Sequence, residues 1–405
     1  MKIGIVSDLH LGYSRWADDS YNQARRAILK ASELCDIIII PGDVFDKENP
    51  SIQTISEVIK ILLELEEKEW GKGIVTYNDQ NQPVKKRLPI AVIHGNHERI
   101  DKSKLNPVQF VNLTKFWIDV HNMPIIFEKD NEKVRVCGMG AVPEDLAKIV
   151  LNKMNAEPKQ GMFNVLMLHQ TFNEFVPIDK SDYLCYEDLP KGFELYVNGH
   201  IHKKIIDMDG KFIVPGSTVL TQLNKEEQES KGFIVYDTKN NTHEFIEIDS
   251  RPFIYKKLTF EDCEQTQVEL KVNETVNEII EQYSNPIIRI VLDGNLIKGL
   301  KPSDINFRKS YDNALLFIEN QFEGYTIKST INKIQMAKKE NNDPKAMGMT
   351  LLREKLKQIE FEEDDIEQIF NAMADSADKG MEYIESLKKE HNKEENEEQG
   401  KQNKL

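Results

Sequence analysis

The segment KIGIVSDLHLG, residues 2–12, joins an apolar run to two polar side chains spaced two residues apart. Short runs of consecutive apolar residues are typical of strands that are buried on both faces, as in parallel sheets covered by helices. Asp8 and His10 would then follow the carboxyl end of a strand, on one side of a continuing extended chain. Because this end of an open α/β sheet lines the ligand crevice, the segment predicts an α/β layered fold with a site there.

Seven further apolar runs of the same kind occur before residue 250, and they alternate with segments of helical spacing at residues 21–34 and 52–70. The runs are CDIIII (35–40), LPIAVI (88–93), VRVCGMGA (134–141), FNVLML (163–168), FELYVN (193–198), KFIVPG (211–216) and GFIVYD (232–237). Pro50 and Ser51 mark the start of the second helix. This alternation of strand and helix predicts a layered α/β domain.

Changes in pattern divide the chain into five expected parts. Residues 1–250 form the α/β domain, and residues 251–334 change to a small α+β pattern. Residues 335–349 mix charge, Asn, Pro and Gly as a linker does, and residues 350–387 have helical spacing. Residues 388–405 read as a charged, disordered tail.

The net charge of −15 at first disfavours a polyanionic partner. However, residues 359–387 contain ten acids and the single base Lys379, a net charge of −9, so the remainder carries −15 + 9 = −6. Some of these remaining carboxylates are expected to bind cations, which leaves room for a local positive site.

The sequence shows neither a signal peptide nor an apolar stretch of the roughly 18 residues that a membrane span needs, so we expect no membrane association. The cysteines lie far apart, which argues against a thiolate zinc site or a disulfide framework and for reduced thiols in a cytoplasmic protein. They are Cys35, Cys137, Cys185 and Cys263.

Eight polar side chains follow successive strands, among them five of the nine histidines of the chain. They are Asp8, His10, Asp43, Asn96, His97, His169, His200 and His202. A lone histidine near a strand end is commonly a hydrogen-bonded structural residue, but so many at successive ends predict one shared centre. Imidazole, carboxylate and amide ligands suit manganese or iron better than a thiolate-binding metal.

These candidate ligands are too many for one metal ion. Two metal ions about 3.5–4 Å apart, bridged by a carboxylate, would bind a phosphoryl group and lower the pKa of a bound water. The glycines of the GD, GNH and GH motifs fit such a site because they allow the backbone to approach the ions closely.

The ordered motifs DLH, GDVFD, GNHE, His169 and GHIH resemble those of the calcineurin-like metallophosphoesterases. With IVSDLHLG, HGNHE, VNGHIH followed by VPGS, the small second domain and the terminal helices, the chain is similar to the Mre11/SbcD family of double-strand-break repair nucleases. This resemblance implies a four-layer metallophosphoesterase β-sandwich flanked by helices, a small α+β capping and DNA-binding domain, and C-terminal helices.

The resemblance also implies roles for individual side chains. Two sets would each hold one metal ion and share Asp43 as the bridge: Asp8, His10 and His202 in the first, and Asn96, His169 and His200 in the second. His97 would be the general acid that protonates the leaving oxygen.

Two positions depart from the commonest pattern of the family, and other residues are weaker candidates. Asp46 stands where some members have a second active-site histidine, and Glu98 stands where Asp is commoner and is expected to support the ligands. Lys203 and Lys204, beside the histidines, are candidate DNA contacts. The stretch GSTVLTQ, residues 216–222, is either a phosphate or DNA contact through hydroxyls and backbone amides or, as we favour, a simple turn after a strand.

From the resemblance we expect a DNA exonuclease and endonuclease with two manganese ions per subunit, iron or magnesium being alternatives, acting in double-strand-break repair. One alternative is a metallophosphoesterase acting on small phosphodiesters or phosphoproteins, which would not need the C-terminal half. Another is a non-catalytic scaffold subunit of a replicative polymerase, although such copies tend to lose ligands. Expected localisation is cytoplasmic, associated with the nucleoid of a prokaryotic cell.

The resemblance also implies two protein partners, a second copy of the chain and an ATPase. A homodimer would form through residues 52–65 and 108–117, whose apolar side chains alternatively belong to the core of the monomer. Residues 350–387 carry an apolar stripe at helical spacing, which would bind a Rad50/SbcC-type coiled-coil ATPase or else fold back on the catalytic domain.

Overall fold

The computed structural model describes residues 1–322 except residues 102, 122, 177–179, 298–299, 306 and 308–310. The expected linker, the helical segment 350–387 and the charged tail therefore lie outside the described residues. None of the described helices is sufficiently long and apolar to cross a membrane.

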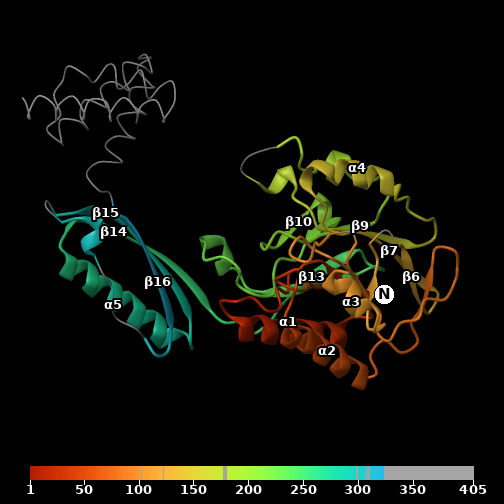
Figure 1. Ribbon diagram of the computed structural model, residues 1–405, viewed down its shortest axis with the longest axis horizontal. Helices are drawn as coiled ribbons and strands as arrows, with labels where there is room; N and C mark the ends of the chain where they lie inside the picture. Colours follow the sequence, from red (N-terminus) through yellow and green to blue (C-terminus); the bar gives the residue numbers. More distant parts are fainter. Residues whose placement is uncertain are drawn as a thin grey trace, which may run out of the picture. The chain divides into compact units, whose positions relative to one another are not determined.

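Two β-sheets form the centre of the first part of the chain (Figure 1). The six-stranded sheet has the order β13-β12-β1-β2-β4-β5, and the seven-stranded sheet has the order β10-β11-β9-β8-β7-β6-β3. The strands of the first sheet are β1 (Lys2–Ile5), β2 (Ile37–Pro41), β4 (Ile90–Ile93), β5 (Ile118–Asp119), β12 (Gly232–Asp237) and β13 (Thr242–Glu247). Those of the second are β3 (Val75–Asn78), β6 (Ile125–Lys129), β7 (Glu132–Met139), β8 (Phe163–Leu168), β9 (Leu195–Asn198), β10 (Ile205–Asp207) and β11 (Phe212–Val214).

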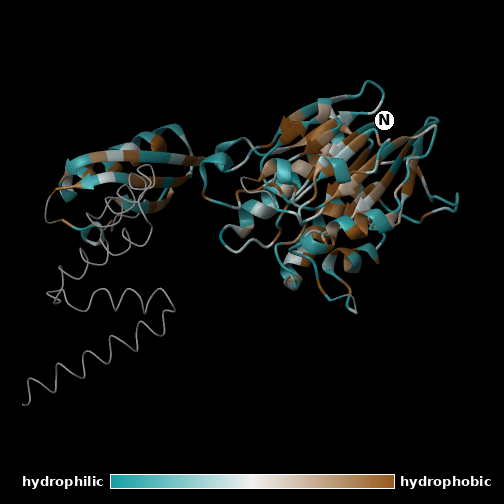
Figure 2. Ribbon diagram, turned by 90° about the horizontal axis from the view of Figure 1, so that it is seen from above, coloured by the Kyte–Doolittle hydropathy of each residue, from teal (hydrophilic) through white to brown (hydrophobic). Residues whose placement is uncertain are grey.

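The inner faces of the two sheets share one apolar core, and Figure 2 shows hydrophobic residues concentrated in these strands. The location of strand β2 explains why its sequence is a continuous apolar run. Ile37 and Ile39 lie in the core between the sheets, whereas Ile38 and Ile40 lie in the core beneath the helices. Since successive side chains of a strand point to opposite faces, both faces of β2 are buried.

Helices cover the outer faces of both sheets. The helices α1 (Ala17–Leu34), α2 (Ile52–Glu67) and α3 (Pro107–Asn112) pack on the first sheet, and α4 (Glu144–Met154) packs on the second. Ser51 caps α2 as the sequence indicates, because its hydroxyl accepts a hydrogen bond from the backbone amide of Thr54 at 3.1 Å. The predicted four-layer sandwich flanked by helices is thus confirmed.

The central strands of both sheets run parallel, which sets where the loops lie. In the first sheet β1 pairs parallel with β2, and β2 with β4. In the second sheet β7, β8 and β9 are parallel neighbours. The carboxyl ends of parallel strands lie at one edge of a sheet, so the polar residues that follow β1, β2, β4, β8 and β9 are placed to meet.

A three-stranded sheet in the order β14-β15-β16 follows, together with the helix α5 (Gln265–Gln282). Its strands are β14 (Phe253–Cys263), β15 (Ile287–Leu296) and β16 (Leu315–Phe322). The chain divides into two compact units, and the first break falls within β14, between Lys256 and Lys257. The five-part domain division stays a prediction.

Candidate metal centre

The turns after the central strands hold their polar residues in an unusual backbone conformation. Asp8, His10, Asp43 and His200 have φ values of 51°, 45°, 49° and 74°, in the left-handed region. This region costs a non-glycine residue about 1–2 kcal/mol. Such residues persist where the surrounding structure determines them, and they cluster at functional sites.

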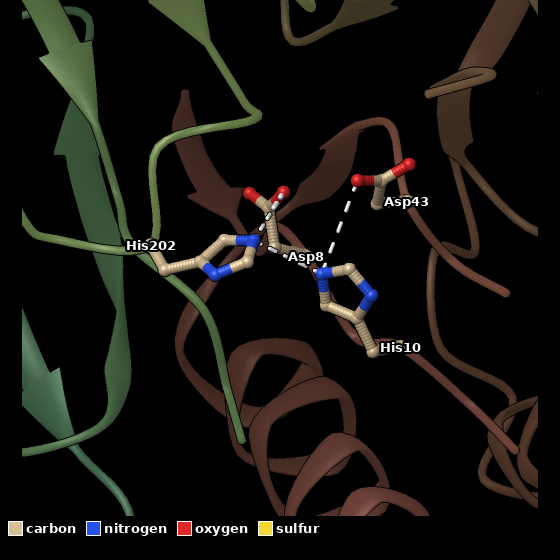
Figure 3. Close-up of side chains that lie close together, drawn as sticks. All are labelled: Asp8, His10, Asp43 and His202. Atoms are coloured by element: carbon tan, nitrogen blue, oxygen red, sulfur yellow. Dashed lines mark hydrogen bonds and ion pairs between the residues drawn. The ribbon is translucent and has the colours of Figure 1, made fainter. Parts of the chain in front are cut away.

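The first group of candidate ligands consists of Asp8, His10, Asp43 and His202, whose ligand atoms all lie within 4.8 Å of one another. Figure 3 shows the two imidazoles directed toward the two carboxylates. Nε2 of His10 lies 3.1 Å from Nε2 of His202 and 3.9 Å from Oδ2 of Asp43. Nε2 of His202 lies 3.9 Å from Oδ1 of Asp8.

A second group consists of Asp43, His169 and His200, so Asp43 belongs to both groups. The amide oxygen of Asn96 completes it, at 3.0 Å from Nε2 of His169 and 2.9 Å from Nδ1 of His200. Oδ2 of Asp43 is buried and has no hydrogen-bond partner among the described residues, although Nε2 of His169 lies 3.2 Å away. A buried carboxylate oxygen of this kind needs a positive partner, so the donor set fits two divalent ions that share Asp43.

Two of the imidazoles are oriented by groups that can only accept a hydrogen bond. Nδ1 of His10 lies 3.3 Å from Oδ1 of Asp46, and Nδ1 of His169 lies 2.7 Å from the carbonyl oxygen of Pro41. In the neutral ring that a metal ion requires, a carbonyl or a carboxylate holds the proton on Nδ1 and leaves the lone pair of Nε2 directed toward the candidate ions.

Burial and mutual charge shift the pKa values of these groups. Burial raises the pKa of Asp8 to about 6. Burial also opposes ionisation of Asp43, but the charge and hydrogen bond of His169 together with the charges of His10 and His97 outweigh it and keep the pKa of Asp43 below its usual value. Burial would lower the pKa of His169, whereas the Asp43 carboxylate raises it to about 9. Burial lowers the pKa of His200 to about 4 and that of His202 well below its ordinary value, so both are neutral at pH 7, as metal ligands must be.

Comparison with known proteins agrees with this geometry. A family model described as calcineurin-like phosphoesterase matches residues 1–204. The chain belongs to this family. It is also 24% identical over 332 residues to the DNA double-strand break repair protein Mre11 of Methanocaldococcus jannaschii, covering 78% of this chain and 82% of that protein.

Further relatives carry the same description. The Mre11 of Methanococcus maripaludis is 27% identical over 355 residues, covering 79% of this chain and 89% of the relative. The double-strand break repair protein MRE11 of Arabidopsis thaliana is 23% identical and matches 75% of this chain but 51% of its own length. The resemblance predicted from the motifs is confirmed, and the chain is a phosphoesterase.

The position of His97 in this phosphoesterase differs from that of the ligands. Its Nδ1 lies 2.9 Å from the carbonyl oxygen of Asp46, which requires a proton on Nδ1 and leaves Nε2 free. The side chain is 38% exposed, and its ring lies 4.8 Å from that of His10. His10, Asp46 and His97 form a third group of close ligand atoms. The backbone amide of His97 donates to Oδ1 of Asp43 at 3.1 Å, so the loop also supports the shared carboxylate.

Glu98 ties two loops of the site together. Its carboxyl group is fully buried and accepts hydrogen bonds from the backbone amides of Phe45 at 2.8 Å and Gly95 at 2.7 Å. Burial, and then the charge of Asp43, raise the pKa of Glu98 to about 8. Glu98 thus joins the turns that follow β2 and β4, and its role in supporting the ligands stays a prediction.

The two lysines beside the histidines have other neighbours in the structure. Lys203 is half-exposed, with Nζ 3.8 Å from a carboxylate oxygen of Glu229. Nζ of Lys204 lies 4.1 Å from the centre of the Phe245 ring. The contacts of both lysines with DNA stay a prediction.

The stretch 216–222 holds a residue whose role the sequence did not indicate. The hydroxyl of Thr221 contacts Nδ1 of His202 and lies 2.9 Å from Oε1 of Glu227. Lys231 in turn donates to Glu227. The Thr221 hydroxyl therefore faces a candidate ligand and a carboxylate, and the spacing of Ser and Thr in a turn gave no signal of this contact.

Gly95 allows the GNHE loop to approach Asp43. A Cβ atom at Gly95 would lie 2.0 Å from Oδ1 and 2.5 Å from the backbone nitrogen of Asp43. We expect Gly95→Ala to displace the shared carboxylate and to weaken Mn²⁺ binding about 10–100-fold, measured by titration of the metal-free protein. Gly161→Ala is the control for general destabilisation, because its Cβ would meet nothing within 4 Å while its φ of +77° strains the backbone. Equal affinities in the two variants would contradict the prediction.

Proposed function

We propose that this phosphoesterase is a manganese-dependent DNA exonuclease and endonuclease of double-strand-break repair. The observation that carries the proposal is Asp43, a buried carboxylate that two separate groups of ligand atoms share. The Mre11 proteins among the relatives support the choice of DNA as the substrate. Imidazole and carboxylate ligands without thiolate support manganese, with iron or magnesium as alternatives.

Each residue has a distinct task in the proposed reaction. Two divalent ions, when bound, supply Lewis-acid stabilisation of the phosphoryl oxygens and an activated water. Asp43 holds the two ligand sets at a fixed separation, and Asp46 and Pro41 direct the imidazoles of His10 and His169. His97, with its proton on Nδ1 directed away, presents Nε2 to the leaving oxygen and, when protonated, donates a proton to it.

A comparison of three classes of substrate tests the proposal. The full-length protein with Mn²⁺ is assayed on a single-stranded oligonucleotide, on a cyclic nucleotide and on a phosphopeptide, with EDTA as the control. We expect EDTA-sensitive cleavage of the oligonucleotide. In a second assay on hairpin and circular DNA we expect cleavage of both substrates, and cleavage of the circle reports the endonuclease activity because a circle has no end. Hydrolysis of only the cyclic nucleotide or phosphopeptide would instead favour a small-molecule phosphodiesterase or a phosphoprotein phosphatase.

The ATPase partner is proposed from the sequence, because residues 350–387 lie outside the described residues. Deleting everything after Met347 is expected to spare Mn²⁺-dependent nuclease activity and to abolish stable association with a Rad50/SbcC-type ATPase. Co-purification of the two proteins and an oligonucleotide assay measure the two effects. A truncated protein that still binds the ATPase would place the contact elsewhere, and one without nuclease activity would favour a helical segment folded on the catalytic domain.

The apolar surface that α2 and α3 leave exposed for the proposed homodimer is smaller than their sequence suggests. Much of the apolar surface of α2 and α3, including Val58, Ile61 and Val108, is buried in the core. Phe110 and Leu113 stay 50% and 60% exposed. We expect Phe110→Ser to convert a dimer to a monomer, measured as mass in solution at micromolar concentration. A monomeric wild-type protein would exclude the dimer.

The proposed substrate would place the protein with chromosomal DNA in the cytoplasm.

A further inference from the structure

His202 differs from the other two imidazoles that present Nε2 to the candidate ions. At His10 and His169 the partner of Nδ1 is a group that accepts hydrogen bonds and has no proton to give. At His202 the partner is the hydroxyl of Thr221, which can donate or accept. The position of the proton on this imidazole therefore depends on where the hydroxyl directs its own proton.

A buried ion pair determines that direction. Oγ1 of Thr221 lies 2.9 Å from Oε1 of Glu227, and Nζ of Lys231 donates to the other oxygen of the same carboxylate. Glu227 and Lys231 are only 7% and 8% exposed. A carboxylate paired with an ammonium group accepts hydrogen bonds and donates none. The single proton of the Thr221 hydroxyl is thus drawn toward Glu227.

We propose that Thr221, Glu227 and Lys231 are positioning residues that fix the tautomer of His202. With its own proton donated to Glu227, the Thr221 oxygen accepts the Nδ1 proton of His202 and leaves Nε2 free to bind a cation. If Glu227 were absent, the hydroxyl could donate to Nδ1, and the imidazole proton would then occupy Nε2, where the cation must bind. The inference rests on the proposed two-metal function.

The surrounding contacts hold the backbone of this stretch independently of the hydroxyl. The backbone amide of Ser217 donates to the carbonyl oxygen of His202 at 3.1 Å. The hydroxyl of Tyr13 donates to the carbonyl oxygen of Thr221 at 2.6 Å. Replacing the Thr221 side chain with one of the same shape therefore removes the hydroxyl and keeps these contacts.

Thr221→Val and Thr221→Ser form a matched pair that tests the proposal in the full-length protein. Mn²⁺ binding to the metal-free protein is followed by electron paramagnetic resonance of the free ion. We expect Thr221→Val to weaken one of two ions about 10–100-fold and to leave the other unchanged, as loss of a hydrogen-bond partner behind a metal-binding histidine typically does. Thr221→Ser, which keeps the hydroxyl, should bind both ions as the wild type does.

The tautomer itself gives a second readout. In the metal-free protein labelled with ¹⁵N-histidine, one imidazole should change from the Nδ1–H form to a mixture in Thr221→Val and not in Thr221→Ser. The double variant Glu227→Leu/Lys231→Met removes the ion pair and leaves the hydroxyl without its acceptor. It should therefore weaken the same ion, and thermal melting of each metal-free variant checks that the fold is intact.

Several outcomes would overturn the inference. Wild-type affinity in Thr221→Val, or in Glu227→Leu/Lys231→Met, would show that the tautomer of His202 is fixed without these three positioning residues. An equal loss in Thr221→Ser would show that the hydroxyl is not the operative group, and an equal loss of both ions would indicate general loosening. Wild-type behaviour of the variants would refute the tautomer inference and leave the proposed function standing, whereas a wild-type protein that binds no Mn²⁺ would refute the proposed function itself.

Discussion

Replacing Asp43 with alanine should abolish nuclease activity and remove most of the bound metal. The carboxylate belongs to both ligand groups, so its loss weakens both candidate ions and exposes their charges to each other. Removing the carboxylate deletes a unit negative charge beside each ion, which at about 4 Å and an effective dielectric constant of 20 loses about 4 kcal/mol of attraction per unit of ionic charge, so the affinity for a divalent ion should fall by at least about 10³-fold. The measurement is a Mn²⁺ titration of the metal-free protein, combined with an oligonucleotide cleavage assay.

His10→Ala is the matched control for the shared role of Asp43. His10 lies in the first ligand group and in the group with Asp46 and His97, but not in the second ligand group with His169. We therefore expect His10→Ala to weaken one ion strongly and to spare the other. Identical titrations for Asp43→Ala and His10→Ala would argue against a bridging carboxylate.

His97→Ala should retain both metal ions and lose about 10²–10⁴-fold in the rate of phosphodiester cleavage, the usual effect of removing a general acid. The structure explains why the metal should stay. The contact of His97 with the shared carboxylate of Asp43 comes from the backbone amide, which alanine keeps. The imidazole supplies the group that would donate the proton, Nε2, because its other nitrogen, Nδ1, faces the carbonyl oxygen of Asp46.

Metal analysis and single-turnover cleavage of the same preparation separate the two effects. His243→Ala is the control, since His243 is an exposed residue of strand β13. Loss of one equivalent of manganese in His97→Ala would identify His97 as a ligand within its group with His10 and Asp46. A cleavage rate near that of the wild type would remove the general-acid role.

The strands and their polar ends were the part of the molecule that sequence patterns predicted well. Runs such as that of residues 37–40 are readable because strands buried on both faces must be apolar at every position. Parallel pairing then fixes which ends meet, so residues as far apart as Asp8 and His202 fall in one group. By contrast, β13 is exposed at most positions, and no continuous apolar run marks it.

The supporting contacts could not be read from the sequence. Thr221 sits in a turn rich in Gly, Ser and Thr, where a hydroxyl is ordinary, and its contact with His202 depends on how two loops pack. The pair of Glu227 and Lys231 has the spacing of a common surface ion pair, and only burial distinguishes it. The apolar face of α2 is equally ambiguous, because a core and an interface demand the same residues.

The left-handed backbone at four of the candidate ligands also bears on how this protein can evolve or be engineered. Each of these residues adopts a conformation that glycine adopts at little cost, so substitution by glycine relieves local strain while deleting a ligand. These side chains also make buried contacts, such as that of Asp43 with His169 at 3.2 Å, so a glycine at these positions gains backbone freedom but loses such contacts together with a ligand. A stabilised variant should therefore be sought elsewhere in the chain.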